Sequence, residues 1–420
     1  MKVFKFGGAS VKDAAGVKNL AKIVEQHDDS LMVVVSAMGK TTNAMEALVE
    51  AYMMRDLSLV SERFGTVMDY HIQISEALFD GGVSCISELL SLLEDKLKTE
   101  PSLNYDFEYD QIVPFGELLS TTIVSAYLNV VGYTNEWIDI RKYIRTDDCY
   151  RSANVNWDLT AHLLKSEIEF SQKQVFVSQG FIGSTENNLT TTLGREGSDY
   201  TGAILAHVLE AEYLAIWKDV PGVLNADPRW YPKATKVKEL SYWEAIELTY
   251  YGAQVIHPKT LKPLQNAQIP LLVKSFVDAS EPGTIIKSSE QHEYLGPIYV
   301  LKQDQVLISV SPKDFSFIIE ESLSVIFQIF SKHRISLNLM QTSALNLSVC
   351  VDDSNRLEAA IADLQQQFVV RYNVDLELLT IRHYTNESID KMLCNKEVID
   401  SQVSRKTARY VLKKTEWLFD

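Results

Sequence analysis

The sequence is poor in cysteine and in positive charge. Its 420 residues hold four cysteines with no C-x-x-C spacing, Cys85, Cys149, Cys350 and Cys394. This scarcity argues against a disulfide framework or a zinc knuckle and is typical of reduced thiols in a cytoplasmic protein. Lys and Arg number 40 against 56 Asp and Glu, so the formal net charge is −16. That charge disfavours proteins that coat nucleic acids or anionic membranes, because both would repel it.

Long hydrophobic runs are also missing. No uninterrupted apolar stretch of ~18 residues, the length that spans a bilayer, occurs in the sequence. The first residues hold no apolar run typical of a secretory leader. We therefore expect no membrane span and a location in the cytoplasm. An apolar content of 46% is ordinary for a globular protein, and the length is sufficient for two or three domains.

What the sequence does contain is a regular alternation of strand-like and helix-like segments before residue 285. Short apolar runs predict strands at residues 2–6, 31–36, 111–114, 133–138, 174–178, 213–217 and 270–275. Amphipathic patterns predict helices at 17–24, 116–130, 157–167, 199–210 and 242–250, and an almost wholly helical stretch at 44–99. This alternation indicates an α/β domain of three layers (αβα), in which helices cover both faces of a mostly parallel sheet.

The pattern changes after the turn Pro282-Gly283-Thr284. Strands are predicted at 306–310, 335–342, 345–351 and 368–372, and helices at 321–333 and 354–367, which is the β-α-β-β-α-β order of a small α+β module. The tail predicts a strand at 376–381, a helix at 386–398 and a strand at 409–413. We therefore expect one domain at 1–285 and a second region at 296–420. Its first module covers about 304–373, and 296–302 with 375–420 form a shortened second module.

The segment that opens the chain predicts an anion-binding turn. Gly7 and Gly8 follow the first strand and precede a helix. Backbone N–H groups and a helix N-terminus should therefore meet at the carboxyl edge of the sheet. Lys5 lies inside that strand, where a lysine is costly unless it has an anionic partner. Glycines also serve turn geometry alone, and for the Gly-Gly pair by itself this alternative stays open.

The turn after the second strand offers small polar side chains. Ser36, Thr41 and Thr42 could contact a small polar ligand, although capping of the next helix by Thr41 or Thr42 explains the threonines equally well. The segment Gly39-Lys40-Thr41 is similar to the end of a P-loop. The glycine that a P-loop needs five positions earlier is Val34, so we exclude that motif.

The densest polar motif runs from Thr190 to Gly202. Ser198 is expected to cap the helix that begins there. Asp199 should then lie in the first turn, where the helix dipole favours a negative charge. Arg195 could bind a carboxylate through two parallel hydrogen bonds. A capped helix with a surface ion pair is the structural alternative.

Charged residues in tight turns follow the strand at 213–217. Lys218 and Asp219 come first, and Asp227 and Arg229 follow a few residues later. Such groups at the end of a strand fit the ribose and phosphates of a nucleotide. Ordinary turn formation is the alternative, because Pro-Gly and Asp-Pro pairs form turns by themselves.

Taken in order, these motifs resemble those of the aspartokinase family. The matching segments are Lys-Phe-Gly-Gly-x-Ser at 5–10, Ser-Ala-x-x-x-x-Thr-Asn at 36–43, Gly-Glu-Leu-Leu-Ser at 116–120, Thr-Thr-Leu-Gly-Arg-x-Gly-Ser-Asp-Tyr-Thr at 191–201, Trp-x-Asp-Val-Pro-Gly at 217–222 and Gly-Ala-x-Val-x-His-Pro at 252–258. The resemblance implies an amino-acid-kinase domain with C-terminal ACT regulatory modules. It also implies transfer of the γ-phosphoryl group of ATP, bound with Mg²⁺, to the β-carboxylate of L-aspartate. The alternatives are a kinase for another carboxylate, such as glutamate, and an amino-acid sensor that keeps the fold without catalysis.

The resemblance further implies roles for particular residues. Lys5, Gly7, Gly8 and Asp199 would be catalytic, with Asp199 orienting Lys5. Arg195 would hold the substrate α-carboxylate, and Glu117 would face the α-ammonium group. The rest of the substrate pocket would be Ser36, Thr42, Phe181 and Ser198, and the nucleotide site would be Lys5, Gly7, Gly8, Ser10, Lys218, Asp219, Asp227, Arg229 and Gln254. No metal site formed by protein ligands is expected.

The sequence also departs from the family pattern. Lys218 and Gln254 stand where many relatives have Thr and Lys, which suggests that one cation has moved between two turns near the nucleotide. In the first ACT module Glu321 replaces a glycine and Asn338 an aspartate. Glu321 hinders the close approach of a ligand carboxylate, so whether lysine, threonine or another effector binds stays open. A homo-oligomer that dimerises through the ACT region is expected.

Overall fold

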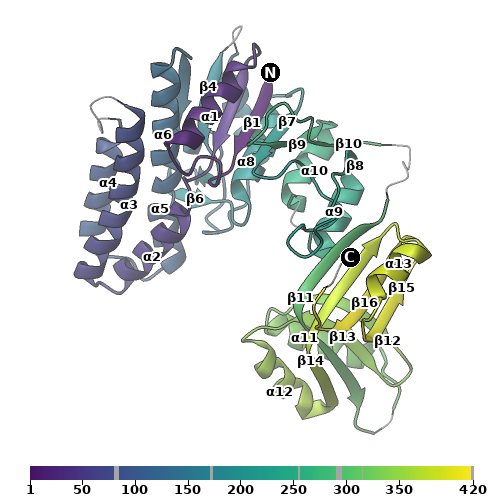
Figure 1. The fold of residues 1–420 in the computed structure, drawn as a ribbon. Coiled ribbons are helices and arrows are strands. Elements are labelled where there is room, and N and C mark those ends of the chain that lie inside the picture. The colour runs from purple at the N-terminus through teal and green to yellow at the C-terminus, as the bar shows by residue number, and fades with distance from the viewer. Residues whose placement is uncertain (80–84, 171–173, 254–255, 290–295, 315, 418–420) are drawn as a thin grey trace. The chain divides into compact units, whose positions relative to one another are not determined.

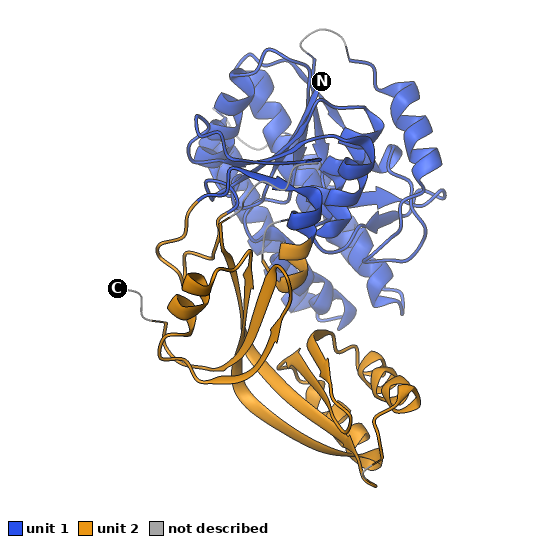
Figure 2. Ribbon diagram, turned by 90° about the vertical axis from the view of Figure 1, so that its right-hand side faces the viewer, with its two compact units in different colours: residues 1–223, 236–246, 256–290 blue, residues 224–235, 247–255, 291–420 orange. Residues whose placement is uncertain are grey.

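The structure is a computed structural model that describes residues 1–79, 85–170, 174–253, 256–289, 296–314 and 316–417 (Figure 1). The chain forms two compact units (Figure 2). Unit 1 comprises Met1–Val223, Lys236–Ile246 and Ile256–Glu290, and unit 2 comprises Leu224–Thr235, Glu247–Val255 and Gln291–Asp420. Unit 2 thus includes two short segments that precede the boundary expected from the sequence, and that boundary stays a proposal.

Unit 1 is built on an eight-stranded sheet in the order β3-β4-β2-β1-β7-β9-β10-β8. Neighbouring strands are parallel, except that β9 and β10 pair antiparallel. The strands are β1 (Lys2–Phe6), β2 (Leu31–Val35), β3 (Asn135–Ile138), β4 (Val175–Gln179), β7 (Leu214–Lys218), β8 (Glu239–Ser241), β9 (Leu271–Ser275) and β10 (Thr284–Lys287). β2 is buried along its whole length, as expected for a strand with helices on both faces. The α/β fold expected from the sequence is confirmed.

Helices of unit 1 cover the two faces of this sheet differently. Phe4, Phe6 and Trp217 point to the face that forms the main core with α1 (Ala14–Glu25), α2 (Thr41–Met53), α3 (Leu57–Leu78), α4 (Ser87–Lys98), α5 (Tyr105–Ile112) and α6 (Phe115–Val130). Side chains alternate along a strand, so Lys5 points to the other face. On that face Lys5 lies under α8 (Gly197–Val208). The other helices, in chain order, are α7 (Trp157–Glu167) before α8, and α9 (Tyr242–Tyr251) and α10 (Pro258–Ala267) after it. None of the described helices is both long and apolar enough to cross a bilayer.

Several segments of unit 1 differ from the expectation, and the short strands β8 and β10 are among those not expected. The strand expected at 111–114 is wrong, because Tyr105–Ile112 form α5, whose first turn is capped by the Asn104 side chain. A run as short as Ile112 to Pro114 does not distinguish a strand from the end of a helix. Helix α10 was not predicted, since Pro258 and Pro263 obscure its helical pattern. The hairpin of β5 (Ile182–Ser184) and β6 (Thr190–Thr192) was not predicted either.

Unit 2 contains a six-stranded antiparallel sheet in the order β12-β13-β11-β14-β16-β15. Its first module has the predicted order: β11 (Ile298–Pro312), α11 (Glu320–Lys332), β12 (Leu337–Thr342), β13 (Leu347–Asp352), α12 (Leu357–Gln367) and β14 (Phe368–Arg382). α13 (Asn386–Leu393), β15 (Val398–Val403) and β16 (Thr407–Lys413) follow. The helix expected at 386–398 ends early, because Asn395 adopts a left-handed φ of 60°.

Asn338 on β12 lies in a polar cluster of this sheet. Its amide nitrogen donates hydrogen bonds of 2.8 Å to Asp352 Oδ1 and to Gln305 Oε1. Its amide oxygen accepts a hydrogen bond of 2.7 Å from Lys302. An aspartate at this position would place a second carboxylate against Asp352 and would lose both donated bonds. The departure from the family pattern therefore fits the neighbours that this chain has.

Candidate active site

The proposed site residues of unit 1 gather where parallel strands end. β4, β2, β1 and β7 are consecutive in the sheet and parallel, so their carboxyl ends lie at one edge. Gly7 follows β1, Ser36 follows β2 and Gly180 follows β4, while Lys218 ends β7. Ligands of open α/β sheets bind at this edge, in the crevice outside the strand ends.

Lys5 and Asp199 form an ion pair at this edge. Nζ of Lys5 lies 2.5 Å from Oδ1 of Asp199, and the two side chains are 9% and 6% exposed. Burial alone would raise the pKa of Asp199, but the positive charges of Lys5 and Lys218, with the hydrogen bond from Lys5, hold that pKa below its ordinary value. The carboxylate therefore stays ionised and fixes the lysine, as the resemblance implies.

In the turn after β1, Gly8 is required because another backbone segment passes close to it. A Cβ built on Gly8 would lie 2.3 Å from the carbonyl oxygen of Ala37, and the Gly8 carbonyl accepts a hydrogen bond of 2.9 Å from the N–H of Gly39. The turns after β1 and β2 thus touch through their backbones. A Cβ on Gly7 would lie in ordinary contact, 3.8 Å from Nζ of Lys5, so the glycine keeps a side chain off that largely buried ammonium group.

The N-terminus of α1 does not lie directly after the Gly7-Gly8 turn, contrary to the expectation from the sequence. α1 begins only at Ala14, and the side chain of Asp13 accepts a hydrogen bond of 2.8 Å from the N–H of Gly16. Its first turn is thus already capped by a carboxylate. The start of α1 therefore does not supply free N–H groups at the turn of Gly7 and Gly8.

Glu117 on α6 is a buried carboxylic acid beside the turn after β2. Its Oε1 accepts a hydrogen bond of 3.2 Å from the N–H of Ala37, and Oε2 is buried with no hydrogen-bond partner among the described residues. Burial raises the pKa of Glu117 to about 8, although the N–H of Ala37 and the charge of Lys5 act in the opposite direction. Nearby, the carbonyl of Ser36 accepts a hydrogen bond of 2.7 Å from Ser120, and Thr42 lies half-buried in the first turn of α2.

The start of α8 corrects one expectation. Ser198 is not the N-cap: that position is Glu196, with a left-handed φ of 54°, and Ser198 is already helical. Ser198 instead packs on Gly180, where an added Cβ would lie 2.5 Å from the serine Cβ. Phe181 has a φ of 73°, and its N–H donates a hydrogen bond of 3.0 Å to the hydroxyl of Thr201. These contacts lock the turn after β4 onto α8.

Arg195 precedes that helix and is exposed. No hydrogen bond or ion pair of its guanidinium group occurs within the described part of the chain, so the group is available to a ligand. Its place depends on the backbone on either side, where Gly194 has a φ of 77°.

The expected nucleotide residues divide between the units. Lys218 and Asp219 follow β7 in unit 1, whereas Asp227 and Arg229 belong to unit 2. Arg229 Nε donates hydrogen bonds of 3.0 and 2.9 Å to the two carboxylate oxygens of Asp227, which lowers the pKa of Asp227. These two charges thus offset each other. Gln254 lies outside the described residues.

Comparison with known proteins agrees with this arrangement. The model of the amino acid kinase family matches residues 1–275. The lysine-sensitive aspartokinase 3 of Escherichia coli (strain K12) is 31% identical over 377 residues, which is 88% of this chain and 82% of that protein. The chain belongs to the aspartokinases of the amino acid kinase family.

Solved structures agree with this assignment. Crystal structures of E. coli aspartokinase III align with 98% of this chain and 96% of theirs. The complex with lysine and aspartate, in the T-state, gives a TM-score of 0.83 at 28% identity. The complex with aspartate and ADP, in the R-state, gives a TM-score of 0.81 at 27% identity. The family and the fold expected from the motifs are confirmed.

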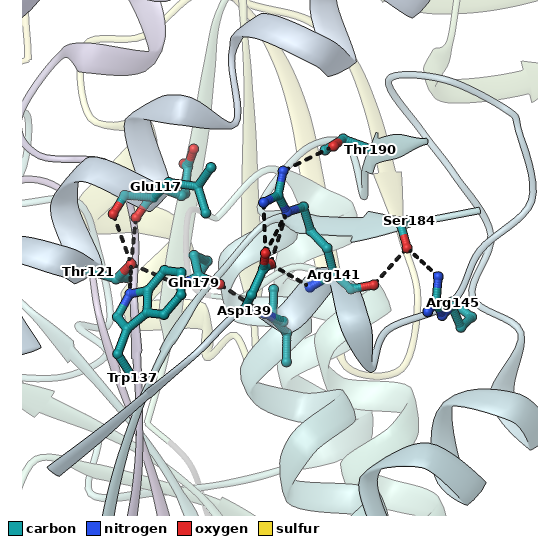
Figure 3. A network of polar contacts seen from close by, with 11 residues as sticks. Glu117, Thr121, Trp137, Asp139, Arg141, Arg145, Gln179, Ser184 and Thr190 are labelled. Carbon is teal, nitrogen blue, oxygen red and sulfur yellow. Dashed lines mark hydrogen bonds and ion pairs between the residues drawn. The ribbon is translucent and has the colours of Figure 1, made fainter. Parts of the chain in front are cut away.

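The aspartokinase site has a supporting network that the motifs did not reveal (Figure 3). Thr121, one turn after Glu117, accepts hydrogen bonds of 2.9 Å from Trp137 and from Gln179. Oε1 of Gln179 accepts a bond of 2.9 Å from the N–H of Ile140, in the segment that carries Asp139 and Arg141. The network links α6 to the strands and turns around it, and only a weak pattern of isolated polar residues marks it in the sequence.

The guanidinium group of Arg141 is central to the second half of this network (Figure 3). It donates to both oxygens of Asp139, with Nε–Oδ1 at 2.9 Å, and to the hydroxyl of Thr190 on β6 at 3.3 Å. Ser184 on β5 donates to the carbonyl of Arg141 at 2.6 Å. The hairpin that precedes Arg195 is therefore held from one side by Arg141.

Proposed function

We propose that this aspartokinase transfers the γ-phosphoryl group of ATP to the β-carboxylate of L-aspartate, which gives 4-phospho-L-aspartate and ADP. The observation that carries the proposal is the buried pair of Lys5 and Asp199 at the carboxyl edge of the sheet, with 2.5 Å between their charged atoms. The E. coli aspartokinase III that was solved with aspartate and ADP supports the same two ligands here.

The reaction needs no general base from the protein. The pKa of an aspartate side chain is ~3.9, so the attacking carboxylate is already ionised at neutral pH. One of its oxygens forms a bond to the γ-phosphorus, and the bond from that phosphorus to the β,γ-bridging oxygen breaks, so that ADP leaves with the electron pair. Catalysis then consists of bringing two anions together and neutralising the charge on the phosphoryl oxygens.

Lys5 is the residue we assign to that charge. Its ammonium group is fixed by Asp199, and the glycine at position 7 places no side chain against it. A pre-oriented cation in a buried site stabilises a developing negative charge without reorganising. Backbone N–H groups of Gly7 and Gly8 supply further donors for the phosphates.

The amino-acid substrate would be held at its two other charges. The unpartnered Oε2 of Glu117 would accept the α-ammonium group, and the exposed Arg195 would bind the α-carboxylate through two hydrogen bonds. Ser36, Thr42, Phe181 and Ser198 would shape the remaining walls.

The nucleotide would lie against the ends of β1 and β7, near Gly7, Gly8 and Ser10 on one side and Lys218 and Asp219 on the other. A role for Asp227, Arg229 and Gln254 in binding ATP stays a proposal. Among the described residues no group of three His, Cys, Asp or Glu could hold a metal ion. We propose that Mg²⁺ is held mainly by the phosphates, where the ion would offset their charge, and Asp219 is an exposed carboxylate at the same edge of the sheet.

The regulatory properties are also proposals. We propose a dimer formed through the ACT region and an amino acid as effector. The E. coli aspartokinase III bound to lysine is a precedent for such an effector. Activity in the cytoplasm is proposed on the sequence evidence alone.

The decisive experiment measures ADP release by the full-length protein with MgATP and either L-aspartate or L-glutamate. We expect turnover with aspartate and its loss in Lys5→Met. Lys2→Met is the matched control, because Lys2 lies in the same strand and pairs with the exposed Asp29. Turnover with glutamate alone would favour the glutamate kinase alternative. Binding of an amino acid without ADP release would favour the sensor.

A further inference from the structure

Asp110 on α5 lies outside every motif used above, yet it is fully buried. We infer that Asp110 is a positioning residue, which fixes the turn that carries Arg195 and thereby sets the affinity for the α-carboxylate of the substrate. This inference rests on the role proposed for Arg195.

Asp110 joins three segments that are far apart in the sequence. Its Oδ1 accepts a hydrogen bond of 2.8 Å from the hydroxyl of Thr192, the last residue of β6. Its Oδ2 accepts bonds of 2.9 Å from the N–H of Thr192 and 3.0 Å from the N–H of Arg151. One side chain thus holds the end of β6 and the loop at 151 together. Buried carboxylates with several donors are costly to remove, because each donor is left unpaired.

The loop held by Asp110 packs directly on the turn before Arg195. The N–H of Ala153 donates a hydrogen bond of 2.9 Å to the carbonyl of Thr192. A Cβ built on Gly194 would lie 3.1 Å from the carbonyl oxygen of Arg151. Arg151 itself has a left-handed φ of 65°, a conformation that persists only where surrounding contacts impose it. The bond to Asp110 is such a contact.

Arg195 depends on this backbone because its own side chain contributes nothing to its position. Only Leu193 and Gly194 separate it from the anchored Thr192, and the N–H of Leu193 donates a bond of 2.8 Å to the carbonyl of Phe181. The N–H of Gly197 closes the turn by donating to the carbonyl of Gly194 at 3.0 Å. A shift at Thr192 would therefore reach the guanidinium group through a short and ordered segment.

The helix that carries Asp110 also leads to the other proposed ligand of the amino acid. α5 passes through Val113 and Pro114 into α6, which bears Glu117 in its first turn. Gln111 adds a second link to the hairpin, since its side chain donates a bond of 2.9 Å to the carbonyl of Thr190. One continuous segment thus sets the separation between the ammonium ligand and the carboxylate ligand.

The test compares three variants of the full-length protein. Asp110→Ala removes all three bonds. Asp110→Asn keeps the shape, because an amide oxygen can accept both N–H groups and the NH₂ group can donate to the Thr192 hydroxyl. Asp106→Ala is the matched control: Asp106 lies on the same helix and pairs with the side chain of Arg151 at 3.3 Å, but it is exposed.

We expect Asp110→Ala to raise the KM for aspartate about tenfold or more, because small displacements of a substrate-binding group cost affinity steeply. The KM for ATP should stay within twofold. Asp110→Asn should recover most of the aspartate affinity, and Asp106→Ala should leave both constants unchanged. In an Arg195→Ala background, Asp110→Ala should raise the KM for aspartate no further, because its effect acts through that arginine.

Several results would overturn the inference. Equal increases of both KM values in Asp110→Ala, or an additive effect in the Arg195→Ala background, would show a general structural role. If Asp110→Ala does not fold, the double variant Asp110→Asn with Thr192→Val replaces it. A wild-type KM for aspartate in that double variant would also overturn the inference. An unchanged aspartate KM in Arg195→Ala alone would instead refute the role proposed for Arg195, so the two failures are distinguishable.

Discussion

The ammonium group of Lys5 lies 2.5 Å from Oδ1 of Asp199, and both side chains are almost fully buried. The two residues come from β1 and from the first turn of α8, so the pair connects the central strand to the helix that crosses it. Nothing else in the described part of β1 is charged and buried. Because a buried charge must be paired, this contact constrains both the fold and the site.

Replacing Asp199 by asparagine tests the pair. The variant keeps the size of the side chain but removes the charge that holds Lys5, so we expect kcat to fall about a hundredfold or more, as for other lost transition-state contacts. The KM for aspartate should change little. Steady-state ADP release measures both constants. Asp29→Asn removes the exposed partner of Lys2 at the other end of β1 and should leave kcat unchanged. A kcat near the wild-type value in Asp199→Asn would contradict the assigned role of Lys5.

The raised pKa of Glu117 predicts a pH dependence of aspartate binding. The free carboxyl group, with a pKa of about 8, is largely protonated at pH 7, whereas a bound ammonium group favours the ionised form. Binding therefore releases a proton, and the KM for aspartate should fall by up to about tenfold per pH unit between pH 6.5 and 8 and level off above. The substrate carboxylates do not titrate there, and Asp110, whose pKa is raised to about 6, titrates lower.

Glu117→Gln is the control for that profile. The amide cannot ionise, so the aspartate KM should be high and constant over the same pH range. The variant should also unfold at a higher temperature than wild type at pH 8. Since the folded pKa lies above the unfolded value, wild-type stability falls as the pH rises from about 4.5 through 8, and the amide has no such loss. A KM profile in Glu117→Gln that still falls with pH would assign the titration to another group.

The proposed site residues follow from local rules of the sequence, and the structure brings some of them together. A lysine inside a buried strand predicts an anionic partner, and Lys5 pairs with Asp199. The polar stretch at 190–202 indicated a ligand site for a similar reason. Ser198 shows the limit of local rules: its sequence position suits an N-cap, but close packing on Gly180 places it inside the helix.

What the sequence did not reveal depends on contacts between distant segments. Local sequence patterns do not mark Asp110, because its donors Thr192 and Arg151 are far from it in the chain. The strand expected at 111–114 failed for a related reason, since a few apolar residues fit either structure until packing decides. The continuity of β11 and β14 through both modules is likewise a tertiary property, because each half alone reads as an ordinary short strand.

Alanine substitutions at Gly8 and at Gly7 can be compared to test the backbone contact in the turn after β1. A methyl group at Gly8 would lie 2.3 Å from a backbone oxygen, which cannot move without displacing the turn after β2. We expect Gly8→Ala to destabilise unit 1 by about 1–3 kcal/mol and to lower the thermal unfolding midpoint. Gly7→Ala meets only Lys5 Nζ at 3.8 Å, so it should retain the wild-type midpoint but lose activity as the methyl group covers the ammonium. Equal midpoints for the two variants would contradict the close backbone contact.

Lys218 is the second cation, after Lys5, whose positive charge lowers the pKa of Asp199. The motif resemblance implies that many relatives have a threonine at this position and a lysine at position 254. We expect Lys218→Thr to raise the KM for ATP about tenfold, the effect of losing one charge-assisted contact. Adding Gln254→Lys should restore it.

Lys165→Thr removes a lysine paired with the exposed Glu210 and serves as the control for net charge. The KM of this variant for ATP should equal that of the wild type. An unchanged KM for ATP in Lys218→Thr would show that the cation at the end of β7 serves Asp199 and not the nucleotide. Failure of the double variant to recover would contradict the hypothesis that a lysine at position 254 can replace the cation at position 218.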